Sequence, residues 1–361
     1  MRMPARLLLG VLAWGLAAPL AAPALAQAAA GAPASEAPPS GSGGAIDKRI
    51  EQTLQAAGES AVPPDYAYGA YQRGYFLTAF AIALEQAKRG KAAAQTLLGE
   101  LLSRGLGVKR DYAEAAEWYR LAAEAGDAEA LYALGRMYLE GLGLEQDAAE
   151  AAELLERAGG RGHAVALREL AYLLLQGRGV EKNPMLAAAY LRKAASAGDM
   201  DAQFALGGLF MEGVGVVGNE AEAARWYAEA ARNGHVAAQV EYAILLFNGR
   251  GVPKDEAVAA RWFRQAALAD SPVAQVRLAR LLAEGRGVSK DGREAAKWYL
   301  LARRRGLRDE FMEDALLKLP ADDLRAADAA AERWLTARGG MIASAPMAAE
   351  EQSPAVDRLV R

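Results

Sequence analysis

The sequence contains no cysteine, and only 7% of its 361 residues are aromatic. Without cysteine the chain can form no disulfide, no cysteine-ligated zinc site and no thiol nucleophile. Few aromatics beside 53% hydrophobic residues argue against one wide core of bulky side chains. The 45 acidic and 42 basic residues nearly balance, which argues against a nucleic-acid-binding surface. The composition favours helices that approach each other closely across small side chains.

Residues 1–26 have the pattern of a signal peptide. Arg2 and Arg6 precede an apolar, uncharged run over residues 7–22, and Ala24-Leu25-Ala26 supplies a small-x-small cleavage signal. The run is short for a bilayer-spanning helix, which needs about 20 apolar residues. We therefore expect export to the periplasm, cleavage after Ala26 and no membrane span in the mature chain. Secretion past the outer membrane is the alternative location.

The chain repeats with a period of 36 residues through six copies, without insertion or deletion. Each copy carries two glycines separated by one residue, the signature of a solenoid whose units pack on their neighbours. The first glycines are Gly105, Gly141, Gly177, Gly213, Gly249 and Gly285. The second glycines are Gly107, Gly143, Gly179, Gly215, Gly251 and Gly287.

Each copy predicts two helices joined at the glycine pair. A helix such as that over residues 128–140 ends at the first glycine, which can adopt positive φ. Four residues after the second glycine, an Asp or Asn is placed to cap the second helix. These caps are Asp111, Asp147, Asn183, Asn219, Asp255 and Asp291. A glutamate three residues later predicts a capping box in four copies, at Glu114, Glu150, Glu222 and Glu294.

Every second helix carries an alanine pair followed by bulky side chains. The pair begins at Ala115, Ala151, Ala187, Ala223, Ala259 and Ala295. Three residues after its first member come large fillers such as Trp118-Tyr119 and Trp298-Tyr299. Alternating bulk with alanine gaps predicts close interlocking of stacked helices.

This pattern resembles the Sel1-like repeat family, which is related to the tetratricopeptide repeat. In the second copy the matching residues are Ala130, Leu134, Gly135, Tyr138, Gly141, Gly143, Asp147, Ala151, Ala158 and Gly162. The resemblance implies an all-α, right-handed solenoid of 36-residue helix-turn-helix units that binds proteins and has no chemistry of its own.

The repeats divide the chain into segments with different expected roles. Residues 27–62 are rich in Ala, Pro, Gly and Ser, a composition that predicts a disordered linker. A short helix around residues 46–57 is the alternative for that part of the linker. The expected segments are a signal peptide (1–26), that linker (27–62), a degenerate leading repeat (63–92), six repeats (93–306), C-terminal capping helices (307–338) and a disordered tail (339–361).

Positions on the first helices that vary between units suggest a binding surface. Side chains spaced by four and then three residues share one helix face. If first helices line a concave groove, as in the related tetratricopeptide fold, the groove contains aromatic, aliphatic and arginine side chains, types that interfaces favour. The predicted partner-binding residues are Tyr132, Arg136, Arg168, Tyr172, Phe204, Met211, Ile244 and Phe247. The alternative, that some of these side chains pack against the adjacent unit, stays open.

Other apparent sites have structural explanations. The glycine pairs follow helices and recur six times, unlike a phosphate-binding loop. His163 and His235 occupy one repeat position, which holds Asp127, Asp199 and Ser271 elsewhere. We therefore expect an N-cap or solvated role for both histidines, and no metal site.

These observations predict a non-enzymatic scaffold without cofactor. We expect it to bind a protein or peptide of the cell envelope, and the resemblance extends this to an envelope sensor or cell-wall enzyme as the regulated partner. An envelope enzyme and a purely structural or host-interacting secreted protein are the alternatives. The sequence does not predict the oligomeric state.

Overall fold

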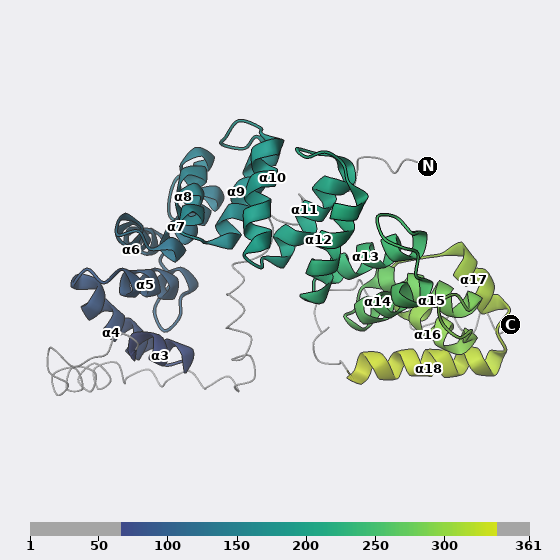
Figure 1. The fold of residues 1–361 in the computed structure, drawn as a ribbon. Coiled ribbons are helices and arrows are strands. Elements are labelled where there is room, and N and C mark those ends of the chain that lie inside the picture. Colours follow the sequence, from purple (N-terminus) through teal and green to yellow (C-terminus); the bar gives the residue numbers. More distant parts are fainter. Residues whose placement is uncertain (1–65, 338–361) are drawn as a thin grey trace, which may run out of the picture. The chain divides into compact units, whose positions relative to one another are not determined.

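The computed structural model describes residues 66–337, which form sixteen helices and no strand (Figure 1). The chain divides into two compact units, Met1–Ala197 (unit 1) and Gly198–Arg361 (unit 2). The described part of unit 1 contains α3 to α10, and that of unit 2 contains α11 to α18. The predicted all-α class of paired helices is confirmed. The predicted signal peptide, linker and C-terminal tail lie outside the described residues.

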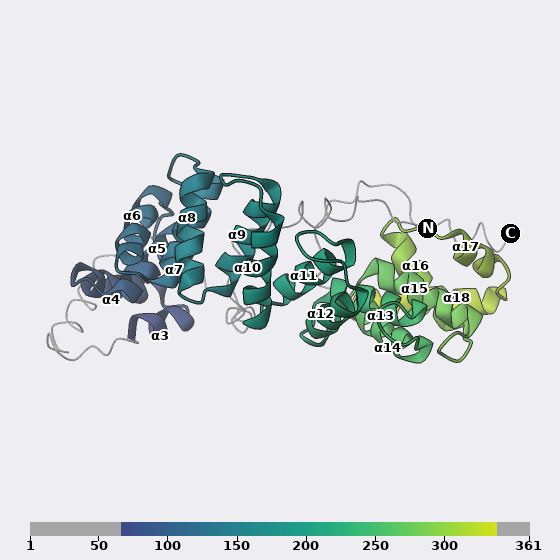
Figure 2. The same cartoon turned by 45° about the horizontal axis from the view of Figure 1, so that its top comes forward.

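Each of the six copies forms an antiparallel pair of 13-residue helices (Figure 1, Figure 2). The first helices are α5 (Ala92–Arg104), α7 (Ala128–Glu140), α9 (Ala164–Gln176), α11 (Met200–Glu212), α13 (Val236–Asn248) and α15 (Pro272–Glu284). The second helices are α6 (Tyr112–Glu124), α8 (Ala148–Gly160), α10 (Pro184–Ser196), α12 (Glu220–Arg232), α14 (Glu256–Leu268) and α16 (Gly292–Arg304).

The two glycines of each turn have different tasks. The first is the C-cap of its helix in the left-handed region, as in Gly213 with φ of +72°. The second also has positive φ, and in five of the turns, at Gly107, Gly143, Gly179, Gly251 and Gly287, it lies against the backbone of the preceding second helix of the same unit. A Cβ on Gly251 would lie 2.2 Å from the carbonyl oxygen of Glu220. The first position therefore needs glycine because of its positive φ. The second needs glycine because of its positive φ and because it lies so close to a neighbouring backbone.

The predicted caps form, but the predicted capping boxes are wrong. Asp111 and its five equivalents accept a hydrogen bond from an N–H of the first turn. The N–H of each cap residue is donated to the preceding first helix, for example from Asp111 to the Leu102 carbonyl oxygen at 3.1 Å. Since that N–H is already satisfied, the Glu114 carboxylate instead accepts from the Trp118 indole, at 3.4 Å.

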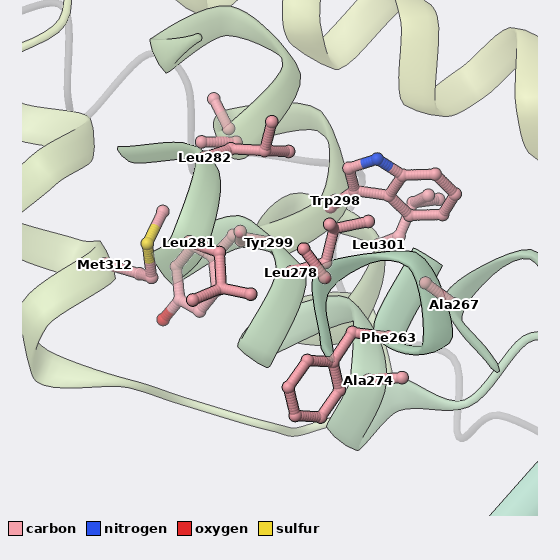
Figure 3. Packing of buried hydrophobic residues seen from close by; sticks show 14 of the residues in the cluster. Phe263, Ala267, Ala274, Leu278, Leu281, Leu282, Trp298, Tyr299, Leu301 and Met312 are labelled. Atoms are coloured by element: carbon pink, nitrogen blue, oxygen red, sulfur yellow. The ribbon is translucent and has the colours of Figure 1, made fainter. Parts of the chain in front are cut away.

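The alanine pairs and most of the bulky fillers form the core, as predicted, while Trp118, Tyr190 and Trp262 are half-buried. All twelve paired alanines are at most 3% exposed. Trp298 and Tyr299 are buried in unit 2 together with Leu278 and Leu281 of the first helix and Met312, as Figure 3 shows. A side chain larger than methyl at an alanine position would separate two helices that touch.

Additional helices flank the six pairs. In unit 1, α3 (Tyr66–Gln72) and α4 (Phe76–Lys88) precede the first pair, and α4 lies one period before α6. In unit 2, α17 (Glu310–Leu317) and α18 (Ala321–Ala337) follow the last pair. Leu324 of α18 is buried, and the Trp334 ring lies 6.1 Å from that of Trp298 on α16. No helix within residues 66–337 combines the length and apolarity needed to cross a bilayer.

Candidate partner-binding faces

The eight predicted partner-binding residues lie on four consecutive first helices, two on each. Tyr132 and Arg136 lie on α7, and Arg168 and Tyr172 lie on α9; these form the unit 1 face. Phe204 and Met211 on α11, with Ile244 and Phe247 on α13, form the unit 2 face. All eight side chains are half-buried. The structure thus places them between the core and the surface, and whether they bind a partner stays a prediction.

Tyr132 in unit 1 is held by the next first helix. Its ring stacks on His163, with centroids 4.5 Å apart, and its hydroxyl donates a hydrogen bond to Glu169 Oε1 at 2.9 Å. Burial raises the pKa of the Tyr132 hydroxyl well above its usual value. The ring therefore packs against the adjacent repeat, the alternative that the sequence left open for this position.

Glu169 is a half-buried carboxylate that the sequence reading missed. Burial raises its pKa, while the nearby Arg136 and the hydrogen bond from Tyr132 act in the opposite direction. Arg136 is itself ion-paired with Glu140 on the same helix, and its side chain is only 15% exposed. Tyr132, Glu169, Arg136 and Glu140 consequently form a compact polar network at the unit 1 face.

Phe204 in unit 2 repeats the aromatic–histidine stack without the hydroxyl. Its ring lies 4.5 Å from that of His235 and 5.4 Å from that of Tyr227. It also packs against a buried cluster formed by Ala230, Ala231 and Ala238. Phe204 therefore also contributes to packing between repeats.

Arginines from the glycine turns cover the other end of the unit 2 face. Arg250 Nη2 lies 3.7 Å from Met211 Sδ, and the Arg286 guanidinium lies 4.3 Å from the Phe247 ring centroid. Arg250 lies between Gly249 and Gly251, and Arg286 lies between Gly285 and Gly287. The contacts of these two side chains with the first helix of the preceding repeat were not predicted from the sequence. Each also binds the first residue of a second helix, as Arg286 does with Glu256 Oε1 at 2.6 Å. That hydrogen bond, with one from Lys254, lowers the pKa of Glu256 to about 2.

Glu241 on α13 occupies the same repeat position as Glu169. Burial raises its pKa, and the positive charge of Arg277 partly opposes that rise. Most other units have Leu or Ala at this position. An acidic residue there is the sequence signal that could have identified both carboxylates. The residues at this position in the other units are Leu97, Ala133, Ala205 and Arg277.

A row of buried glutamines is a second feature missed from the sequence. The fourth residue of four first helices is Gln95, Gln203, Gln239 or Gln275, and all four are buried. The Gln239 side-chain amide donates to the Ala231 carbonyl oxygen of the preceding second helix at 3.2 Å. Gln95 and Gln275 make the equivalent bond eight residues back. These three glutamines therefore give a second hydrogen bond to last-turn carbonyls that already accept a backbone N–H, and so tie each first helix to the preceding second helix.

Both histidines are N-caps, as predicted. His163 Nδ1 accepts from the Ala166 N–H at 3.1 Å, and His235 Nδ1 accepts from the Ala238 N–H at 3.0 Å. Their Nε2 atoms face Glu129 at 3.2 Å and Asp201 at 3.4 Å. Within residues 66–337 no group of three or more His, Asp or Glu side chains could hold a metal ion.

Paired helices of constant length, glycine turns and alanine seams define a helical-hairpin repeat protein. The Sel1 repeat family model matches six consecutive segments, residues 92–127, 128–163, 164–199, 201–235, 236–271 and 272–307. The chain belongs to the Sel1 repeat family, which typically mediates protein–protein interactions and whose repeat fold is generally non-enzymatic.

Comparison with solved structures finds other Sel1 repeat proteins. A Sel1 repeat protein from Oxalobacter formigenes has the same fold and is 28% identical, with a TM-score of 0.57 over 68% of this chain and 96% of its own. The protective antigen c5321 of uropathogenic Escherichia coli, which displays an SLR fold, is 22% identical, with a TM-score of 0.38 over 86% of this chain and 90% of its own. Comparison with curated protein sequences gave no match.

Proposed function

We propose that the chain is an exported scaffold that binds a protein or peptide of the cell envelope through the first-helix faces of its two units. The observation that carries the proposal is the composition of these faces, which combine half-buried Tyr, Phe, Met and Arg side chains. Binding hot spots are enriched in Tyr and Arg, and interfaces in Phe and Met. The Arg250 and Arg286 side chains remain 49% and 42% exposed while they cover Met211 and Phe247.

The eight residues of the two faces are not equally suited to a test of partner binding. Tyr132 and Phe204 lie in the first half of their helices and are engaged by N-cap histidines of the same chain. Tyr172 and Met211 are better probes, because each lies in the second half of its helix, away from the end at which those stacks form. Regulation of an envelope sensor or cell-wall enzyme is the role proposed for this binding.

Site-specific photo-crosslinking in the native host tests the binding face. A photoreactive residue placed at Tyr172 or Met211 should form a crosslinked product that is absent when the same residue replaces Glu153. Glu153 is an exposed residue of the second helix α8 and serves as the matched control. Crosslinking from Glu153 alone would contradict the proposed face.

Export is tested separately by mass spectrometry of the periplasmic fraction. Cleavage after Ala26 predicts Gln27 as the first residue. An intact N-terminus in the membrane fraction would contradict export, and it would leave the proposed binding face unaffected.

A further inference from the structure

Arg136 in unit 1 lies beside two carboxylates. It forms an ion pair with Glu140, four residues later on α7, and its charge also acts on Glu169 of the next first helix. Tyr132 completes the arrangement, since its hydroxyl donates a hydrogen bond to Glu169 Oε1 at 2.9 Å. In this unit the chain therefore supplies both the acidic pair and the guanidinium that neutralises it.

Unit 2 keeps both acids and lacks the arginine. Two repeats further along the chain, Glu212 and Glu241 occupy the positions of the two unit 1 carboxylates. The position of the arginine is Gly208, and that of the tyrosine is Phe204. Unit 2 thus has the acidic pair without either of the donors that serve it in unit 1. The first helices of the other repeats all have a larger side chain at the position of Gly208, namely Glu100, Arg136, Tyr172, Ile244 and Arg280.

The missing side chain leaves open space beside the hydroxyl of a buried tyrosine. Among the described residues outside its own helix, a Cβ added to Gly208 would meet one atom within 4 Å, the hydroxyl oxygen of Tyr227 at 3.7 Å. Tyr227 is 5% exposed, and within residues 66–337 its hydroxyl makes no hydrogen bond. The equivalent Tyr299 donates to Glu313 Oε1 at 2.7 Å. Buried polar groups without a partner are rare and call for a specific explanation.

Both carboxylates act on the same hydroxyl. Burial raises the pKa of Tyr227 well above its usual value, and the negative charges of Glu241 and Glu212 raise it further. The two acids therefore lie close to the space over Gly208. Glu241 is half-buried, and no side chain within residues 66–337 forms an ion pair or hydrogen bond with it, since the charge of Arg277 acts only from beyond ion-pair distance. An unpaired carboxylate in such a place costs stability, and a cation would offset that cost.

We propose that the space over Gly208 receives an arginine side chain of the partner, with its guanidinium beside Glu212 and Glu241. This inference rests on the proposed function, because it names the chemical group by which a partner engages the unit 2 face. A guanidinium presents several N–H donors in one plane, so it can serve two carboxylates and the Tyr227 hydroxyl oxygen together. The Phe204 ring, 5.4 Å from that of Tyr227, adds an aromatic neighbour of the kind that guanidinium groups favour.

A titration with small arginine probes tests the site in the intact chain. N-acetyl-arginine methylamide should shift the Gly208 amide resonance in a saturable manner and bind at least about five times more tightly than its neutral isostere, N-acetyl-citrulline methylamide. Glu241→Gln should weaken the arginine probe at least about fivefold, whereas the exposed control Glu153→Gln should leave its affinity unchanged. Equal affinity for the two probes, or full affinity in Glu241→Gln, would overturn the proposal.

Filling the space from within the chain supplies an independent readout. Gly208→Arg should raise Tm at least about 2 °C more than Gly208→Ala, which adds helix propensity without a charge. This excess should disappear in the Glu241→Gln background, because the two positions then no longer interact. Gly208→Arg should also abolish binding of the arginine probe. An excess that persists with Glu241→Gln, or no excess at all, would contradict the assignment of the site.

The arginine site and the proposed function can fail separately. A photo-crosslink from Met211 without binding of the arginine probe would retain the binding face and overturn the arginine site alone. Probe binding at Gly208 without a crosslink from Tyr172 or Met211 would support the guanidinium site and contradict the proposed function alone.

Discussion

Tyr132 of unit 1 and Phe204 of unit 2 lie two repeats apart and have the same neighbour, an N-cap histidine stacked 4.5 Å away. Their surroundings differ, because the Tyr132 hydroxyl binds a half-buried carboxylate whereas Phe204 packs on alanines. The repeat position of Tyr132 and Phe204 therefore contributes both to packing between repeats and to the chemistry of the face. The stacked ring joins neighbouring repeats in both units, and the polar or apolar side chains around it give each face its own chemistry.

Replacing the second glycine of a turn should destabilise both units to the same extent. This is the largest effect that we expect. A methyl on Gly143 or Gly251 would lie 2.4 or 2.2 Å from backbone atoms of the preceding second helix. Gly143→Ala and Gly251→Ala should each lower the free energy of unfolding by about 3 kcal/mol or more, since positive φ alone costs about 1–2 kcal/mol. Denaturant unfolding checks this.

Gly213→Ala is the matched control, because it has positive φ but no atom within 3.4 Å of the added methyl. It should cost about 1–2 kcal/mol, the conformational cost alone. Equal losses at Gly213 and Gly251 would contradict the close-approach role of the second glycine.

Truncating the stacked ring should destabilise both units to a similar extent. Removing a fully buried aromatic side chain costs about 3–5 kcal/mol, so the half-buried Tyr132→Ala and Phe204→Ala should each cost about 2–3 kcal/mol. Thermal unfolding provides the measurement. A loss confined to one variant would show that the two stacks are not equivalent.

Removing only the hydroxyl should distinguish the units. Tyr132→Phe leaves Glu169 without its phenol donor, and a hydrogen bond to a charged group contributes about 1.5–3 kcal/mol when buried, less when solvated. We expect a loss of about 1 kcal/mol for Tyr132→Phe at pH 7. If this variant were as stable as the native protein, the Tyr132–Glu169 bond would have no structural role.

The half-buried carboxylates should make stability fall slightly as pH rises. Burial raises the pKa of Glu169 and of Glu241 in the folded protein, so both hold a proton to higher pH folded than unfolded. Their stabilising contribution is therefore complete below the unfolded pKa and is lost as pH rises through the folded pKa. Glu241→Gln should raise Tm at neutral pH by about 1–3 °C.

At pH 4 the gain from Glu241→Gln should become much smaller, because the glutamate is then mostly protonated in both the folded and the unfolded state. Exposed Glu153→Gln provides the control and should change Tm at neither pH. A gain of equal size at both pH values would mean that charge burial is not its cause.

The period, the glycine turns, the N-caps and the alanine seam could be predicted because each depends on residues close in sequence. The capping boxes failed because the Asp111 N–H is donated to Leu102 of the preceding helix, a bond that depends on how the glycine turn folds back and that the spacing of Asp111 and Glu114 does not reveal. Periodicity alone could not predict that the Tyr132 ring meets His163 at the start of the next repeat. The same holds for Arg286, which reaches back across a repeat to Phe247.

The central claim is that the first-helix faces bind the partner, and an affinity titration tests it most directly. With the photo-crosslinked envelope protein purified, its Kd should be measured for the native chain, Tyr172→Ala, Met211→Ala, and the second-helix controls Glu153→Ala and Arg261→Ala. Hot-spot truncation typically costs about 2 kcal/mol or more, so Tyr172→Ala and Met211→Ala should weaken binding at least about tenfold, measured at a temperature at which each variant is still folded. Unchanged affinity for both, with a similar loss for Glu153→Ala or Arg261→Ala instead, would contradict the account.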